Sequence, residues 1–83
     1  MENAIIDFVS RDLLGKDVAV VTADDEIVLD GTVDSLGVTR LVDFIEKEFS
    51  VTVPPQDVTI ENFRSIATIA QYVRGRQVAE SDA

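Results

Sequence analysis

Residues 35–49, SLGVTRLVDFIEKEF, form the most regular helical pattern in this sequence of 83 residues. Apolar residues recur at intervals of three and four, which places them on one face of an α-helix. The charged residues fall between these positions and therefore lie on the other faces. The stretch predicts an amphipathic helix whose buried stripe consists of Val38, Leu41, Val42, Ile45 and Phe49.

Asp34 and Ser35 lie where this helix begins. Asp34 is a favourable N-cap, because its carboxylate can accept a hydrogen bond from a free N–H group of the first turn. Ser35 is then the first helical residue, with its hydroxyl near the positive end of the helix dipole. An anion attached there, such as a phosphodiester, would be stabilised. The simpler alternative is that these residues only cap the helix, a role worth about 1 kcal/mol.

Two further helical segments flank this helix. Residues 2–14 carry apolar residues at helical spacing and are followed by Gly15, a residue suited to the left-handed conformation that closes a helix. After Pro54-Pro55, which cannot continue a helix, Thr59 can cap a short helical turn that includes residues 61–63. The pattern therefore predicts a short helix before the last one.

The last helix completes the predicted fold. Ser65 can cap this helix, which is expected to end at or just before Gly75. We predict an all-α, small four-helix bundle of three long helices and one short third helix, with a long loop after the first. It forms a single domain over residues 1–77, with a flexible C-terminal tail at 78–83. The expected core includes Ile5, Phe8, Leu41, Ile45, Phe49, Ile66, Ile69, Ala70 and Val73.

The connection over residues 16–34 is longer than usual. Its valines do not predict a strand, because a lone strand would have no partner in so small a chain. Its acids are interpreted as a solvated surface. A calcium loop starting at Asp30 would need an acid or amide where Thr32 lies and a glutamate where Leu41 lies. We expect the loop to close the core with Ile27, Val28 and Leu29.

Composition narrows the function further. The chain has neither cysteine nor histidine, which removes disulfides, thiolate metal sites and histidine-assisted nucleophiles. A formal net charge of −9 disfavours binding to nucleic acids and anionic membranes. No apolar stretch approaches the ~20 residues of a membrane span, and the acidic N-terminus does not resemble a signal peptide. We expect a cytoplasmic monomer with no nucleic-acid or membrane partner and no catalytic or metal-binding residues.

Four segments resemble the acyl carrier protein family, which includes peptidyl and D-alanyl carriers. They are VDSL at 33–36, LVDFIEKEF at 41–49, VTVPPQDVT at 51–59 and ENFRSIATIAQYV at 61–73, in the order the family uses. The tripeptide Asp-Ser-Leu alone is a weak pattern, whereas its combination with the other segments is specific. The resemblance extends from the first helix to about residue 74 of the 83.

The resemblance implies that a phosphopantetheinyl transferase attaches 4′-phosphopantetheine from coenzyme A to Ser35, with Asp34 contributing to its recognition. The thiol of this arm would carry acyl or aminoacyl groups as thioesters from a loading enzyme to downstream transferases or synthases. A chain without cysteine can do this, because the cofactor supplies the sulfur. We expect the acyl group to contact Phe44 and Ile60. The positions that match partner contacts are Leu36, Gly37, Val38, Thr39, Arg40 and Val53.

Leu36 also admits a second interpretation, as a residue of the core. The sequence departs from carriers of primary fatty-acid synthesis, whose second helix is acidic. Residues 35–49 contain three acids and two bases, a net charge of −1, and Gly37 and Arg40 lie where acids are common. Gly37 is expected to leave room for another molecule to approach Ser35. These differences favour a carrier of a specialised pathway such as polyketide or nonribosomal peptide biosynthesis. Because no catalytic domain is attached, we expect a free-standing carrier and not an enzyme.

Other functions stay open on the sequence alone. A carrier for primary fatty-acid synthesis or D-alanyl transfer would use the same serine. A plain acidic helical interaction module would bind a basic partner through its loop and would carry no prosthetic group. An enzyme with paired carboxylates, such as Asp24 and Asp25, is the least supported, because 83 residues leave little room for a tuned acid–base pair.

Overall fold

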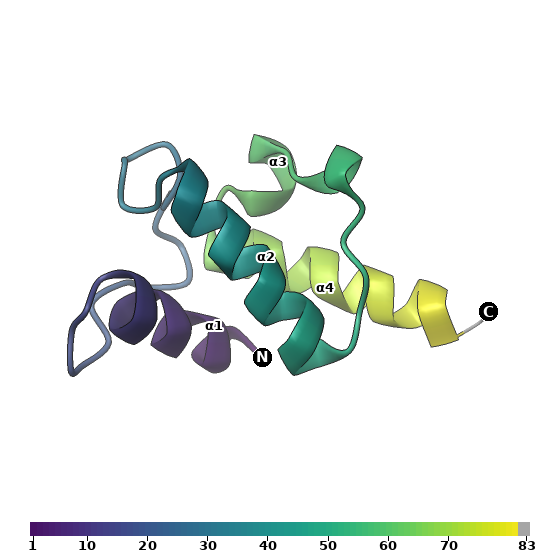
Figure 1. Cartoon of the computed structure of the whole chain (residues 1–83), viewed down its shortest axis with the longest axis horizontal. Helices are drawn as coiled ribbons and strands as arrows, with labels where there is room; N and C mark the ends of the chain where they lie inside the picture. Colours follow the sequence, from purple (N-terminus) through teal and green to yellow (C-terminus); the bar gives the residue numbers. More distant parts are fainter. Residues whose placement is uncertain (82–83) are drawn as a thin grey trace.

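In the computed structural model, which describes residues 1–81, the chain is built from helices (Figure 1). Over this range it contains no β-strand and no helix long and apolar enough to cross a membrane. The predicted all-α bundle with a short third helix is therefore confirmed. The elements are α1 (Glu2–Phe8), the π-helical turn η1 (Val9–Leu13), α2 (Ser35–Phe49), the 3₁₀ turn η2 (Pro55–Asp57), α3 (Ile60–Phe63) and α4 (Ile66–Ser81).

The first helix changes its winding halfway along. α1 continues directly into η1, and Gly15 follows with a φ of 67°, so the predicted helix over 2–14 and its glycine end are confirmed. The π turn has no counterpart in the sequence pattern. Ser10 is buried in this turn, and its hydroxyl accepts a hydrogen bond from the N–H of Val20 at 3.1 Å. This bond attaches the long loop to the first helix.

Side chains from α2 and α4 hold the segment that follows α2. Ser50 ends α2 in the left-handed conformation, with a φ of 54°. The N–H of Thr52 donates to the carboxylate of Glu80 at 3.0 Å, and the carbonyl of Thr52 accepts from Nε of Arg76 at 2.9 Å. The N–H of Val53 donates to the carboxylate of an α2 glutamate at 2.9 Å. The extended segment is thus tied to both neighbouring helices.

Arg76 and Glu80, which make two of these contacts, lie in a part of α4 that the sequence pattern does not predict. The expected end of the helix near Gly75 is wrong, because α4 continues to Ser81. A glycine inside a helix costs about 1 kcal/mol relative to alanine. The side chains of α4 that follow Gly75 contact the segment after α2, and these contacts offset the cost. Within the predicted tail at 78–83, residues 78–81 are helical, and 82–83 lie outside the described residues. The division into a domain and a tail stays a prediction.

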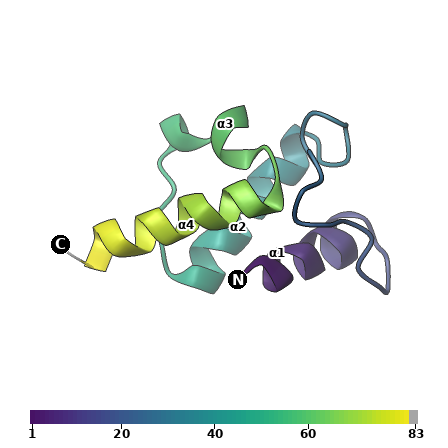
Figure 2. The ribbon, with the colours of Figure 1, turned by 180° about the vertical axis from the view of Figure 1, so that it is seen from behind.

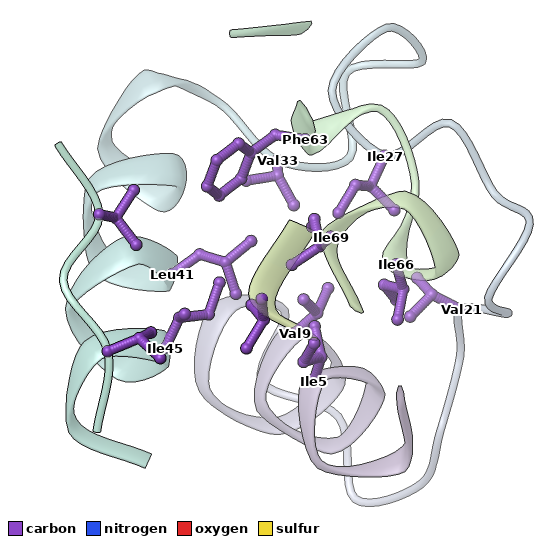
Figure 3. Packing of buried hydrophobic residues seen from close by; sticks show 13 residues of the cluster. Ile5, Val9, Val21, Ile27, Val33, Leu41, Ile45, Phe63, Ile66 and Ile69 are labelled. Atoms are coloured by element: carbon purple, nitrogen blue, oxygen red, sulfur yellow. The ribbon is translucent and has the colours of Figure 1, made fainter. Parts of the chain in front are cut away.

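The core lies where α1, α2 and α4 meet, and the long loop closes it (Figure 3). Ile27 is fully buried and Val28 packs against the core, whereas Leu29 is 53% exposed, so the last of the three expected loop residues does not belong to it. Phe8 and Phe49 are only partly buried at the edge. The predicted residues that are fully buried are Ile5, Leu41, Ile45, Ile66, Ile69, Ala70 and Val73.

The N-terminal end of α2 lies at a junction of three parts of the chain. The long loop packs at the end of the bundle away from the C-terminus, and α2 begins there (Figures 1 and 2). α3 lies beside the same half of α2, on the side away from α1. Ser35, the first residue of α2, therefore lies between the loop and the α3 segment.

Candidate functional site

Asp34 and Ser35 form the start of α2. The carboxylate of Asp34 accepts a hydrogen bond from the N–H of Gly37 at 2.8 Å, which confirms the predicted N-cap. Ser35 is exposed, and its hydroxyl makes no hydrogen bond within residues 1–81. Its carbonyl accepts a bond from the hydroxyl of Thr39 at 3.1 Å. The hydroxyl of Ser35 therefore does not serve as a cap and is available for chemistry.

An apolar cleft of about 260 Å³ opens beside Ser35, between α2 and the α3 segment. Ile60 lines it as expected, but Phe44 does not. Phe44 follows Ser35 by two and a half helical turns, which places it on the opposite face of α2. Its ring stacks there on Phe8, with the ring centroids 4.3 Å apart. The residues that line the cleft are Val28, Ser35, Val38, Thr39, Val58, Thr59, Ile60 and Phe63.

Half of this lining was not among the predicted site residues, namely Val28, Val58, Thr59 and Phe63. Val38 and Thr39 share a helical face with the start of α2, so their contribution can be read from periodicity. Val28 comes from the long loop, and residues 58–63 follow α2 by about ten positions, so only the fold brings them together. No local pattern in the sequence marks these residues as neighbours of Ser35.

The predicted partner residues differ in their exposure. Leu36 projects into solvent with 69% of its surface exposed, which decides against the interpretation as a core residue. Thr39 and Arg40 are also exposed, and Val38 is partly buried at the cleft. Val53 is only 5% exposed, because it packs into the core, and the structure does not support it as a surface contact. We therefore restrict the proposed contact surface to the exposed residues of α2.

Gly37 is buried against the end of the long loop. A Cβ atom at this position would lie 2.9 Å from Cγ1 of Val33 and 3.3 Å from Oδ1 of Asp34. The expectation that Gly37 leaves room for a visiting molecule near Ser35 is therefore wrong. The space is occupied by the chain itself, and the glycine allows the loop to approach the first turn of α2.

Most charged side chains of α2 are already engaged. Lys47 forms an ion pair with Asp43 at 3.0 Å, and Glu46 accepts a backbone hydrogen bond from the segment after the helix. Within the described residues, Arg40 and Glu48 are the charged α2 residues that form neither an ion pair nor a side-chain hydrogen bond. The ion pair cancels within itself, and the remaining charged residues leave this helix a net charge of only −1 to offer a partner.

The acids of the long loop support its turns. Asp25 accepts a hydrogen bond from the N–H of Thr22 at 2.9 Å, and Asp30 accepts one from the N–H of Thr32 at 2.8 Å. Hydrogen bonds from the side chain and backbone of Thr32 lower the pKa of Asp30, because they stabilise its charged form. Over residues 1–81, no group of three or more acids, histidines or cysteines is arranged to hold a metal ion.

Comparisons with known proteins agree with this geometry. Residues 4–73 match the family model for the phosphopantetheine attachment site. Similar curated proteins include the acyl carrier proteins of Rickettsia rickettsii and Rickettsia typhi, each 29% identical over 77 residues, or 93% of this chain and 86% of the relative. A chain from the crystal structure of an FAD-dependent dehydrogenase is 26% identical with a TM-score of 0.76, and the match covers 84% of this chain and 99% of that one.

The fold and the matched family model define a carrier protein with a phosphopantetheine arm. The chain belongs to the acyl carrier protein family, and its cofactor is covalently attached 4′-phosphopantetheine. Membership implies a phosphopantetheinyl transferase and acyl-handling enzymes as partners. The described residues fit this group, because the hydroxyl of Ser35 is exposed and free of hydrogen bonds and an apolar cleft lies next to it.

Proposed function

We propose that Ser35 is the attachment site of the arm, whose thiol carries acyl or aminoacyl groups as thioesters. The observation that supports this is the position of one hydroxyl, exposed at the N-terminus of α2 beside an apolar cleft of about 260 Å³. The partial positive charge at a helix N-terminus stabilises an attached phosphodiester. In this proposal the chain holds the intermediate and has no catalytic role, because partner enzymes perform the chemistry.

Attachment forms a bond between Oγ of Ser35 and the phosphorus of the pantetheine phosphate, and the nucleotide part of coenzyme A leaves. A serine hydroxyl is a weak nucleophile until a base removes its proton. The chain has no histidine or cysteine, so we assign this base to the transferase. The carboxylate of Asp34 is engaged by the N–H of Gly37, and we assign it the role of presenting the helix start to the transferase.

Mass spectrometry of the intact protein tests the attachment site. Coexpression with a transferase of broad specificity should add one phosphopantetheine to the wild type and none to Ser35→Ala. The matched control is Ser50→Gly, since Ser50 is an exposed serine at the other end of α2 in a conformation that glycine adopts readily. This control should be fully modified. A wild type that stays unmodified with active transferase would instead favour the acidic interaction module.

We further propose a specialised pathway, with polyketide or nonribosomal peptide biosynthesis favoured over primary fatty-acid synthesis and D-alanyl transfer. The support is the nearly neutral surface of α2, which leaves little charge to attract a basic partner. Leu36, 69% exposed beside Ser35, offers an apolar contact instead. Loading rates with the true partner enzyme should therefore change little between low and high salt. A steep loss of rate with salt would contradict this.

The match to a chain from the crystal structure of an FAD-dependent dehydrogenase supports one partner class. The matched part, 84% of 83 residues or about 70, makes up 99% of that chain, which is therefore as small as this one. We propose that a flavin-dependent dehydrogenase oxidises the tethered group, with two hydrogen atoms passing from the acyl or aminoacyl group to the flavin. Loaded protein should bleach the flavin absorbance of such an enzyme without oxygen, and protein with an unloaded arm should not. Equal spectra would contradict this partner class.

A further inference from the structure

The outer wall of the cleft beside Ser35 is built from short elements. Residues 58–60 and Phe63 form this wall. They belong to a segment whose regular structure is the three-residue turn η2 and the four-residue helix α3. Helices this short are not stable by themselves in water. The position of the wall therefore depends on its contacts with the rest of the protein.

Asp57, the last residue of η2, connects this segment to α4. The hydroxyl of Tyr72 in α4 donates a hydrogen bond to Oδ2 of Asp57 at 2.6 Å. The side-chain amide of Asn62 in α3 donates to the carbonyl of Asp57 at 2.9 Å. Bonds from a hydroxyl to a carboxylate at this distance are among the stronger ones in proteins. Through Asp57, a single hydroxyl of α4 reaches both η2 and α3.

The ring of Tyr72 makes a second contact with the same segment. Its centroid lies 6.1 Å from that of Phe63, the 2% exposed residue that anchors α3 in the core. Burial and the hydrogen bond to Asp57 raise the pKa of Tyr72, so its hydroxyl stays protonated and able to donate even above the ordinary pKa of a tyrosine. Tyr72 and Asp57 are both partly buried, which shields the bond from water.

We propose that Tyr72 is a positioning residue that, through Asp57, holds the outer wall of the cleft in place and so keeps the cleft able to shelter an acyl group. Neither residue lines the cleft, so the effect is indirect. The statement about acyl groups rests on the proposed function, in which the thioester hangs from Ser35. The statement about the wall is independent of it.

Amide hydrogen exchange of the unmodified protein tests the position of the wall. Tyr72→Phe removes the hydroxyl and keeps the ring against Phe63. Exchange in residues 55–63 should become about 3- to 10-fold faster, the range for loss of one partly exposed hydrogen bond, while α1 and α2 keep their rates. Asp57→Asn, which keeps an acceptor oxygen but loses the charge, should give a smaller increase.

The control for this measurement is Lys47→Gln, which removes an exposed ion pair on α2 and should leave exchange in residues 55–63 unchanged. Unchanged exchange of the same residues in Tyr72→Phe would overturn the proposal. An equal acceleration along the whole chain would overturn it as well, because it would show a general loss of stability in place of a local one.

Thioester protection tests the effect on acyl groups. A transferase attaches acylated phosphopantetheine arms, whose acyl chains increase in length, to the wild type and to Tyr72→Phe. Hydroxylamine then cleaves the thioesters. Acyl groups that the wild type protects should be cleaved several-fold faster in the variant, while the acetyl form, too short to fill the cleft, should react equally. A wild type that protects no acyl group would overturn the sheltering role. A wild type that accepts no arm would instead overturn the proposed function.

Discussion

The two walls of the cleft beside Ser35 are held in place in different ways. On one side, Val38 and Thr39 belong to α2, a helix of 15 residues with an N-cap at Asp34 and an apolar stripe on the core. On the other, residues 58–60 and Phe63 belong to a segment whose regular structure is a turn of three residues and a helix of four, and this segment is tied to α4. The first wall follows from local sequence, and the second depends on contacts between distant residues. Substitutions should therefore affect the two walls differently.

Phe63→Ala should have the largest effect on stability, a loss of about 3–5 kcal/mol in the free energy of unfolding. Its ring is 2% exposed and is the main apolar anchor of the outer wall. Urea denaturation followed by circular dichroism measures the loss. The matched control is Ile60→Ala in the same helix, where the side chain is 54% exposed and the loss should stay below about 0.5 kcal/mol. Equal losses would contradict the anchoring role of Phe63.

Gly37→Ala, at the start of α2, should lower the free energy of unfolding by about 1–3 kcal/mol. The added Cβ would lie 2.9 Å from Cγ1 of Val33, so the end of the long loop would have to move. The same denaturation experiment measures this loss. A variant as stable as the wild type would show that the loop end adapts without cost, and that the close approach at Gly37 is not required.

Asp34→Ala should cost about 1 kcal/mol through loss of the N-cap of α2. Thr59→Ala, the equivalent change in α3, should cost less, because its bond to the N–H of Asn62 is 3.3 Å long against 2.8 Å for Asp34. Thermal denaturation of both variants compares the two caps. Asp34→Asn retains the cap and should stay near wild-type stability. If the transferase nevertheless modifies this variant slowly, the charge of Asp34 contributes to the attachment of phosphopantetheine. A larger loss from Thr59→Ala would contradict the ranking.

Gly75→Ala should stabilise the protein by about 0.5–1 kcal/mol. Gly75 lies inside α4, and no atom outside the local helix lies within 4 Å of an added Cβ. This substitution is the counterpart of Gly37→Ala, since both glycines are helical and only one is crowded. An increase in the melting temperature is the expected result, and a decrease would contradict a helix that continues unbroken through this position.

The titration of Tyr72 should give the smallest effect on the free energy of unfolding, and this effect appears only at alkaline pH. Burial and the bond to Asp57 raise its pKa above the ordinary value of about 10, which the unfolded chain retains. Above that pH the unfolded state loses its proton first, so the stability of the wild type falls as pH rises. Tyr72→Phe lacks this contribution and should show a flatter decline. The chain has one tyrosine, so its ultraviolet titration reports this group alone. Parallel stability curves would contradict the raised pKa.

The candidate site was predictable only where its residues are neighbours in the sequence. Asp34 and Ser35 precede an amphipathic stripe, and a cap followed by an exposed first residue is a local arrangement. The cleft was not predictable in the same way, as the different positions of Phe44 and Ile60 show. Helical periodicity alone excludes Phe44, nine residues after the serine, while only the fold places Ile60 next to it.

The sequence by itself determined the helical class, the start of α2 at Asp34, the closing glycine of the first helix and the absence of histidine and cysteine chemistry. These features depend on residue type and on bonds between residues a few positions apart. Tertiary structure decided the length of α4 and the second wall of the cleft. Each of these depends on which distant side chains come into contact, and such contacts are set by packing of the whole chain.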